Sequence, residues 1–352
     1  MFRKLKHWYE TYETRISIGS LILGFFIDSL TLQRIDALGD NLWIAANLFM
    51  AGLCIVLLSR NKNEDKGFWI PNILQFNFGA LLGSIFVFYL RSTTLAATWP
   101  FLALLLLALI SNEIFQKKYE KLAFQLSFFY FSIFSFSIFL VPLAVKRIGP
   151  EVFILSGIVS LGTLWLFLVI LHRLAREKFL ENRTHIWSFV ILIFVGINAL
   201  YFMNLIPPIP LSLKDSGIYH AITRDSSGNF VAFDEKRGVE KYFTLNEQVH
   251  WQEGENLYAY TAIFSPGSLN VDVVHDWQYQ NSEGKWITAT RIPLYLSGGR
   301  SGGFRTFSNK ANFTPGLWRV DVETLRGQII GRINFEIIPS SSKPTLVSEV
   351  KN

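Results

Sequence analysis

The chain has two parts that differ in the spacing of their hydrophobic and polar positions. Between residues 16 and 206, long apolar stretches are separated by short polar ones. Most approach the roughly 20 residues that an α-helix needs to cross a membrane. Between residues 217 and 338, apolar and polar residues alternate at every second position, which is typical of half-buried strands. The pattern predicts a polytopic α-helical membrane domain followed by an all-β sandwich domain.

Seven apolar stretches are long enough to be membrane spans. The first contains Asp28, so six or eight spans are alternatives to seven. Aromatic residues gather at several ends, as they do at membrane interfaces. The spans are expected at 16–33, 42–59, 72–90, 95–112, 122–143, 152–171 and 186–206.

In the second part, the alternation predicts about eight strands packed as a sandwich. His275 and Trp277 share one face of their strand, and Asp276 and Gln278 take the other. In the same way, Trp318, Val320 and Val322 alternate with Arg319, Asp321 and Glu323.

Another predicted strand is apolar or aromatic on both faces. Tyr258 and Tyr260 share a face opposite Leu257 and Ala259. We therefore expect a central strand covered on both sides; an exposed sugar-stacking platform is the alternative.

These patterns divide the chain into four predicted segments. Residues 1–206 form the transmembrane helical domain, and 207–216 form a Pro-rich linker that begins with PPIPLSL. Residues 217–338 form the β domain. The polar tail, 339–352, is expected to be disordered.

The distribution of charge excludes a nucleic-acid partner. The net charge is +6, and all of it comes from residues 1–210, which carry 18 Lys/Arg and 12 Asp/Glu. Residues 211–352 carry 15 of each. Basic residues placed between hydrophobic stretches are typical of membrane topology, not of a DNA-binding face.

The same residues predict an orientation. The N-terminus and alternate connecting loops carry 14 Lys/Arg, against 4 in the remaining loops. Positive loops stay in the cytoplasm, so the N-terminus is expected inside and everything after Pro208 outside. Cys54, the one cysteine, lies in a predicted span, and an exported domain without disulfides favours a bacterial envelope. The expected location is the bacterial inner membrane, with the C-terminal domain periplasmic or extracellular.

The segment SGGRSGGFRTFSNK, residues 297–310, concentrates glycine and positive charge. It lacks the spacing of a nucleotide-binding loop. One interpretation is a wide hairpin connection that the glycines allow to turn. A second is a protein-partner surface. A third is an anion site for a lipid head group or an envelope glycan, built from backbone N–H groups and basic side chains. Its candidate residues are Gly299, Arg300, Gly302, Arg305 and Lys310.

His275 is a candidate ligand-binding residue, although its apolar neighbours favour a core histidine bonded to backbone. His220 and His250 are the other histidines of this part, and neither has metal-ligand spacing to it. No metal, no cofactor and no nucleophile elbow is indicated.

Asp28 is the candidate polar residue of the membrane half, because a carboxylate within a span is costly unless it is paired or hydrated. Asn72 and Gln75 begin the third span and could face it. The alternative is that Asp28 lies near the outer interface and is hydrated.

Five motifs of the second part resemble the signature of an uncharacterised bacterial domain family. The resemblance covers about 218–338 and implies an exported β domain attached to membrane segments, without implying an activity. The motifs are HDW at 275–277, GGR at 298–300, RTFSNK at 305–310, PGLWRV at 315–320 and GQIIGRINF at 327–335.

Two classes of function fit these observations. The first is a non-catalytic binding or assembly protein in contact with membrane lipid, whose β domain binds an anionic envelope ligand or a membrane protein partner. The second is a transporter or intramembrane enzyme centred on Asp28, with the β domain as a cap.

Overall fold

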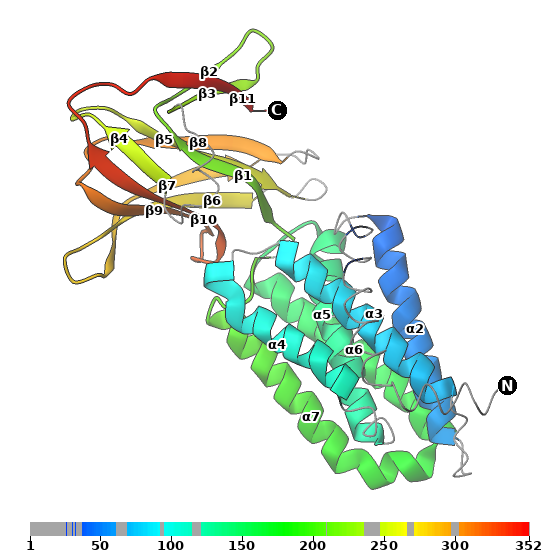
Figure 1. Ribbon diagram of the computed structural model, residues 1–352. Helices are drawn as coiled ribbons and strands as arrows, with labels where there is room; N and C mark the ends of the chain where they lie inside the picture. The colour runs from blue at the N-terminus through cyan, green and yellow to red at the C-terminus, as the bar shows by residue number, and fades with distance from the viewer. Residues whose placement is uncertain are drawn as a thin grey trace, which may run out of the picture. The chain divides into compact units, whose positions relative to one another are not determined.

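The computed structural model describes two compact units, a helical one up to Pro208 and a β unit from Pro210, with residues 95–97 grouped with the second unit (Figure 1). The described residues are Phe26, Leu30, Leu32, 37–60, 69–91, 95–114, 121–208, 210–235, 247–265, 271–296 and 303–351. The predicted first span, with Asp28, lies outside the described residues apart from Phe26, Leu30 and Leu32.

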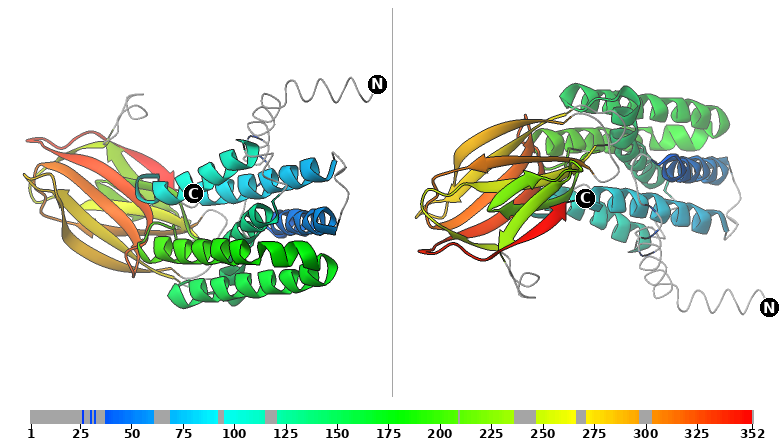
Figure 2. Two further views of the ribbon diagram at one scale, coloured as in Figure 1. Left: turned by 90° about the horizontal axis from the view of Figure 1, so that it is seen from below. Right: turned by 90° about the horizontal axis from the view of Figure 1, so that it is seen from above.

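The other six predicted spans are helices. They are α2 (Leu38–Arg60), α3 (Trp69–Arg91), α4 (Leu95–Ile114), α5 (Leu122–Val145), α6 (Pro150–Leu174) and α7 (Arg176–Phe202). Five of them, all except α4, are long and apolar enough to cross a membrane. In α4 the apolar part is shorter, from Trp99 to Asn112. Helices α6 and α7 run side by side in both views of Figure 2.

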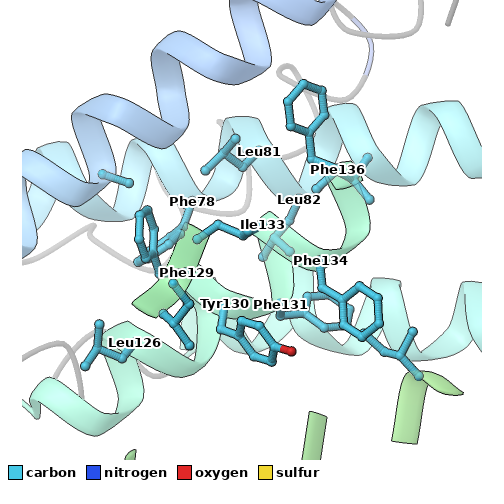
Figure 3. Packing of buried hydrophobic residues seen from close by; sticks show 14 of the residues in the cluster. Phe78, Leu81, Leu82, Leu126, Phe129, Tyr130, Phe131, Ile133, Phe134 and Phe136 are labelled. Carbon is cyan, nitrogen blue, oxygen red and sulfur yellow. The ribbon is translucent and has the colours of Figure 1, made fainter. Parts of the chain in front are cut away.

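Helix α5 is the centre of the helical unit. It contacts α2, α3, α6 and α7, and most of its side chains are buried. Figure 3 shows Phe129, Tyr130 and Phe134 of α5 together with Phe78 of α3 in this core. Because α5 is apolar all round, it can be enclosed by other helices without burying charge.

The described part of the β unit contains eleven strands in three sheets. Sheet A has the order β1-β5-β8, sheet C has β4-β10-β9-β6-β7, and sheet B has β11-β3-β2. The strands are β1 (Ser212–Tyr219), β2 (Ala221–Arg224), β3 (Phe230–Glu235), β4 (Glu247–Trp251), β5 (Leu257–Phe264), β6 (Val271–Gln280), β7 (Trp286–Leu296), β8 (Phe304–Lys310), β9 (Gly316–Thr324), β10 (Ile329–Pro339) and β11 (Leu346–Lys351).

Sheet A lies between the other two sheets (Figure 1). Leu257 and Ala259 of β5 pack into the core against sheet C, with Trp277 and Phe335. Tyr260, on the other face of β5, packs against sheet B. The expectation that this strand is covered on both sides is confirmed.

One glycine allows sheets A and C to approach closely. A Cβ atom at Gly331 of β10 would lie 2.1 Å from Cδ2 of Leu213 on β1. A larger residue would clash with the Leu213 side chain, whose Cβ atom would lie 3.0 Å away, so this side chain or its strand would have to shift.

Two expected boundaries are wrong. Strand β1 begins at Ser212, inside the expected linker. Its backbone pairs with β5 from Ser212, opposite Phe264, to Tyr219, opposite Tyr258. The tail is not disordered throughout, because Leu346–Lys351 form β11 and pair with β3. Five of these six residues are exposed, so the strand has no buried face. Its sequence therefore shows no alternation of apolar and polar residues from which a strand could be predicted.

Candidate functional site

The outer face of sheet C carries buried acidic side chains together with arginines that are partly or fully exposed. The inward residues of β6 and β9 fill the core, and alternation therefore directs their charged neighbours to the opposite face. We name this group the charged face; its members are Asp276, Gln278, Arg291, Arg319, Asp321, Glu323 and Arg332.

Four of these residues form one row across four strands. Arg291 of β7 is the cross-strand partner of Asp276 on β6. Asp276 is the partner of Asp321 on β9, which is in turn the partner of Arg332 on β10. Two like charges thus face each other at the centre of the sheet, an arrangement that is destabilising unless each is neutralised.

Asp321 is neutralised by its neighbours. Arg332 donates from Nε to Oδ1 at 2.5 Å and from a terminal nitrogen to Oδ2 at 2.7 Å, a bidentate fork. Arg319 lies 3.7 Å from the same carboxylate, donates to Gln278 Oε1 at 2.8 Å, and stacks over the Trp286 ring.

Asp276 is less well satisfied. Its Oδ2 accepts hydrogen bonds from the Gln278 amide and, at 3.1 Å, from the Thr288 hydroxyl. Its Oδ1 is buried and has no hydrogen-bond partner among the described residues. Both donors are neutral, so among the described residues no cation bonds directly to this carboxylate, and Asp276 is 3% exposed.

Glu323 completes the acidic side of the charged face. Arg291 donates to its Oε2 at 3.1 Å. Burial, followed by the nearby carboxylate of Asp276, raises the pKa of Glu323 to about 7. Glu323 therefore exchanges a proton with solvent near neutral pH.

The inner face of the same sheet holds His275. Its Nε2 lies 3.0 Å from Thr261 Oγ1, and its Nδ1 lies 2.8 Å from Ser308 Oγ. Trp277 Nε1 donates to the same Ser308 oxygen at 3.0 Å. Burial lowers the pKa of His275 to about 3, so the ring is neutral and bonds two hydroxyls that join sheets A and C. His275 is a core residue, but its partners are side chains and not backbone.

The described residues of the predicted anion site are not brought together. Arg305 donates from a terminal nitrogen to the carbonyl oxygen of Lys351 at 3.1 Å. Lys310 donates to the carbonyl oxygens of Ala311 and Asn312, and it lies over the rings of Phe313 and Trp318 at the core against sheet C. Gly299, Arg300 and Gly302 lie outside the described residues.

One glycine of this segment has a clear conformational role. Gly303 has φ +87°, and a Cβ atom there would lie 3.1 Å from the backbone of Ala262 and Ile263. This supports a turning role for that glycine.

A second polar cluster joins the three sheets at one end. His220, between β1 and β2, places Nε2 3.0 Å from Glu235 Oε1 and Nδ1 3.1 Å from Glu255 Oε1. His250 of β4 places Nδ1 2.7 Å from Glu235 Oε2. We name these four residues the histidine cluster. Its hydrogen bonds raise the pKa of His220 against the opposing effect of burial, and they lower the pKa of Glu235 to about 2.

Across the ranges that the structure describes, no group of three or more His, Cys, Asp or Glu side chains is arranged to hold a metal ion.

In the helical unit, the candidate residues Asn72 and Gln75 lie on α3 and are partly buried. The backbone oxygen of Gln75 accepts a hydrogen bond from Asn112 Nδ2 of α4 at 3.3 Å. Because Asp28 is outside the described residues, its proximity to them remains a prediction.

The charged face was not predicted as a site from the sequence, although alternation predicted the face on which each of its β6 and β9 residues lies. Alternation placed Asp276 and Gln278 on one face of β6, and Arg319, Asp321 and Glu323 on one face of β9. The missing information was the order of the strands, which places β6 beside β9. The signal in the sequence was on β9, where three charged residues share one face and the other face is apolar.

Residues 270–337 match the model of a family described as a protein of unknown function (DUF2914). This confirms the resemblance to an uncharacterised domain family, and all five motifs fall inside the match. The match is narrower than the expected 218–338. It includes the residues of the charged face and excludes His220, Glu235, His250 and Glu255 of the histidine cluster.

No curated protein sequence matches the chain. Among solved structures, an immunoglobulin-like protein from Pseudomonas aeruginosa is 10% identical, covers 36% of this chain and 96% of its own, and has a TM-score of 0.20. The alkylpurine DNA glycosylase AlkC of Pseudomonas fluorescens, bound to DNA containing an abasic site analog, is 12% identical, covers 87% of this chain and 100% of its own, and has a TM-score of 0.21. At these TM-scores neither structure carries an argument about this chain.

Proposed function

We propose that the chain is a bacterial inner-membrane protein with about seven spans that presents its β domain, a layered sandwich, outside the cytoplasm to bind a protein partner. Five apolar helices and the bias of Lys/Arg between alternate loops support the membrane topology. The role is binding and not catalysis.

The observation that carries this proposal is that the side chain of Asp276 is buried with a carboxylate oxygen that no described residue satisfies. Its carboxylate is buried opposite Asp321 and near Glu323, and one oxygen has no partner among the described residues. An isolated buried carboxylate is costly, and a cation supplied from outside would relieve that cost. A Lys or Arg side chain of a protein partner is such a cation.

Arg291 is the residue through which a partner would reach this carboxylate. Its side chain is 49% exposed, whereas its partner Glu323 is 9% exposed. An incoming cation can replace Arg291 beside Glu323 and Asp276. The released guanidinium is then free to pair with an acidic group of the partner, so the exchange favours a protein that carries both charges.

Photo-crosslinking in native membranes tests the proposal. A photoreactive residue at Asn334, which is exposed on the same face of sheet C, should crosslink to a discrete protein. The control position for the photoreactive residue is Ser282, which is exposed in the turn between β6 and β7. Asp276→Asn should abolish the Asn334 product. Identical products from both positions, or a product that Asp276→Asn leaves unchanged, would overturn the proposal.

A second candidate is a transporter or intramembrane enzyme centred on Asp28. It is favoured by the hydroxyls of Ser132 and Ser135 on α5, which are buried without a hydrogen-bond partner among the described residues. Asp28→Asn should then abolish function while Asp276→Asn leaves it intact. The opposite result identifies the β domain as the working half.

A further inference from the structure

Strand β11 is attached to the β unit by strand pairing and one buried lysine side chain, with few apolar contacts. It is the edge strand of sheet B, and all six of its residues pair with β3, from Leu346 opposite Glu235 to Lys351 opposite Phe230. Five of the six are exposed, including Leu346, Val347 and Val350. Hydrophobic burial therefore contributes little, and the backbone ladder and Lys351 hold the strand.

Lys351 enters a pocket built by sheet A. Its Nζ lies 3.2 Å from Asp215 Oδ2 on β1, 5.1 Å from the centre of the Tyr219 ring and 5.8 Å from that of Tyr260 on β5. A carboxylate beside two aromatic rings is a favourable environment for an ammonium group. Arg305 of β8 binds the carbonyl oxygen of the same residue. We name Asp215, Tyr219, Tyr260 and Arg305 the lysine pocket.

The pocket has a specific shape requirement. A Cβ atom at Gly217 would lie 2.6 Å from the hydroxyl oxygen of Tyr219. Glycine at this position therefore leaves the space that the Tyr219 ring occupies. The pocket is built by residues of β1, β5 and β8, and Glu349 of β11 itself adds an ion pair to Lys351, with 3.0 Å between Oε1 and Nζ.

We infer that the edge of β3 that β11 covers and the lysine pocket together form a strand-binding site, and that β11 is its tethered occupant. An extended segment of a protein partner with a lysine at the place of Lys351 competes for the same site. In strand addition, main-chain hydrogen bonds give affinity and side-chain pockets give specificity. Both elements are present here: the β3 edge supplies the ladder, and the lysine pocket selects an ammonium group.

The tether explains why β11 occupies the site by default. Residues 340–345 connect β10 to β11, and a short connection of this kind gives its own strand a high effective concentration. A partner segment must therefore bind more tightly than β11 or act when β11 is detached. The site is separate from the charged face, since it lies on sheets A and B.

Peptide binding to the membrane protein in detergent tests the inference. The probe is a fluorescent peptide of residues 344–352, PTLVSEVKN, and the protein is the chain with those residues deleted. The deleted chain should bind the peptide, and the full chain should bind it at least tenfold more weakly because β11 fills the site. A peptide with Lys351→Gln should bind the deleted chain at least tenfold more weakly than the unchanged peptide.

Pocket variants of the deleted chain provide matched controls. Asp215→Asn should weaken peptide binding about tenfold, whereas Asp272→Asn, at an exposed position of β6, should leave it unchanged. Equal binding of the two peptides would exclude the lysine pocket. Equal binding by the deleted and full chains would exclude β11 as the occupant.

A full-length variant covers the case in which the deleted chain does not fold. Lys351→Gln in the full chain keeps β11 but removes the ammonium group from the pocket. The unchanged peptide should bind this variant at least tenfold more tightly than it binds the wild-type chain. The same weak binding to both would overturn the inference.

Discussion

Asp276 of β6 and Asp321 of β9 are direct cross-strand partners, and they are only 3% and 2% exposed. Arg332 makes a bidentate pair with the carboxylate of Asp321, while among the described residues Asp276 accepts hydrogen bonds from neutral donors alone. The repulsion that remains affects Glu323, whose pKa is raised to about 7 by burial first and by Asp276 second. The charged face is therefore a place where stability depends on pH.

Glu323→Gln should stabilise sheet C at alkaline pH. A carboxyl group whose pKa is raised on folding lowers stability as pH rises from its unfolded value, about 4.5, through about 7. The substitution removes this cost, so the gain should be on the order of 2 kcal/mol at pH 8 and close to zero at pH 4. Amide hydrogen exchange of β6 and β9 in the full chain measures it. Glu283→Gln, in an exposed turn, is the control, and an equal gain at both pH values would contradict the prediction.

Ser308→Ala should destabilise the junction of sheets A and C. The hydroxyl bonds both His275 and Trp277, and its loss leaves two buried polar groups without that partner. We expect a cost of about 2–4 kcal/mol, read from faster exchange of β5, β6 and β8. Ser282→Ala, at an exposed turn, should have no effect. A change below about 0.5 kcal/mol would mean that the network contributes little.

The large-scale fold could be predicted from the sequence because both of its signals are local. Apolar length predicted the helices, and the alternation around Tyr258 and Tyr260 predicted a strand covered on both faces. The end of the chain could not be predicted, because Leu346, Val347 and Val350 are exposed in β11. That strand is held by pairing with β3 and by the contacts of Lys351, and neither leaves a periodic pattern.

The candidate site was harder to predict because its contacts join distant strands. Arg305 was expected in an anion site, and its partner is instead the carbonyl oxygen of Lys351. Asp321 and Arg332 lie within one hairpin, but the link from Asp321 to Asp276 depends on β6 lying beside β9. Sheet order is a tertiary property, so alternation gives the face of each residue but not its neighbours.

His220→Asn should destabilise the β unit more at pH 5.5 than at pH 8.5. Glu235 and Glu255 face His220 directly, and His250 faces it through Glu235. The pKa of His220 is raised on folding, so its contribution is full below about 6.5 and is lost as pH rises through the folded value. Glu235, with a pKa of about 2, stays ionised throughout this range.

Hydrogen exchange of β1, β3 and β4 at the two pH values measures this effect. His185→Asn, at an exposed position of α7, is the matched control and should leave exchange in these strands unchanged. A larger loss at pH 8.5 than at pH 5.5 would show that neutral His220 makes the stabilising contacts.

The β unit should fold without the helices, provided that β11 is included. Residues 210–352 contain all strands of the three sheets, whereas 210–340 lack β11, one of the two partner strands of β3, and with it the side chain that fills the lysine pocket. Both fragments should give β-type circular dichroism, with a lower melting temperature for the shorter one. A random-coil spectrum for the longer fragment would show that the sheets need the helical unit.

The predicted topology can be tested by fusions. Because the loops predicted to be inside carry 14 Lys/Arg against 4 in those predicted to be outside, alkaline phosphatase fused after Asn352 should be active. Green fluorescent protein at the same place should be dark when it is exported by the general secretory route. An inactive phosphatase with a bright fluorescent fusion would reverse the orientation.

The parallel pairing of β4 with β10 also bears on when the β unit can fold. Glu247 pairs with Phe335, 88 residues later in the chain, and sheet A likewise joins β1 to β5 and β5 to β8. Contacts between such distant segments form slowly, because a long loop must close before they stabilise anything. During synthesis or transfer across a membrane from the N-terminal side, β4 has no partner until almost the whole unit has emerged. Neighbouring strands such as β2 and β3, or β6 and β7, can pair earlier, but sheets B and C are completed only by β10 and β11, the last strands to emerge.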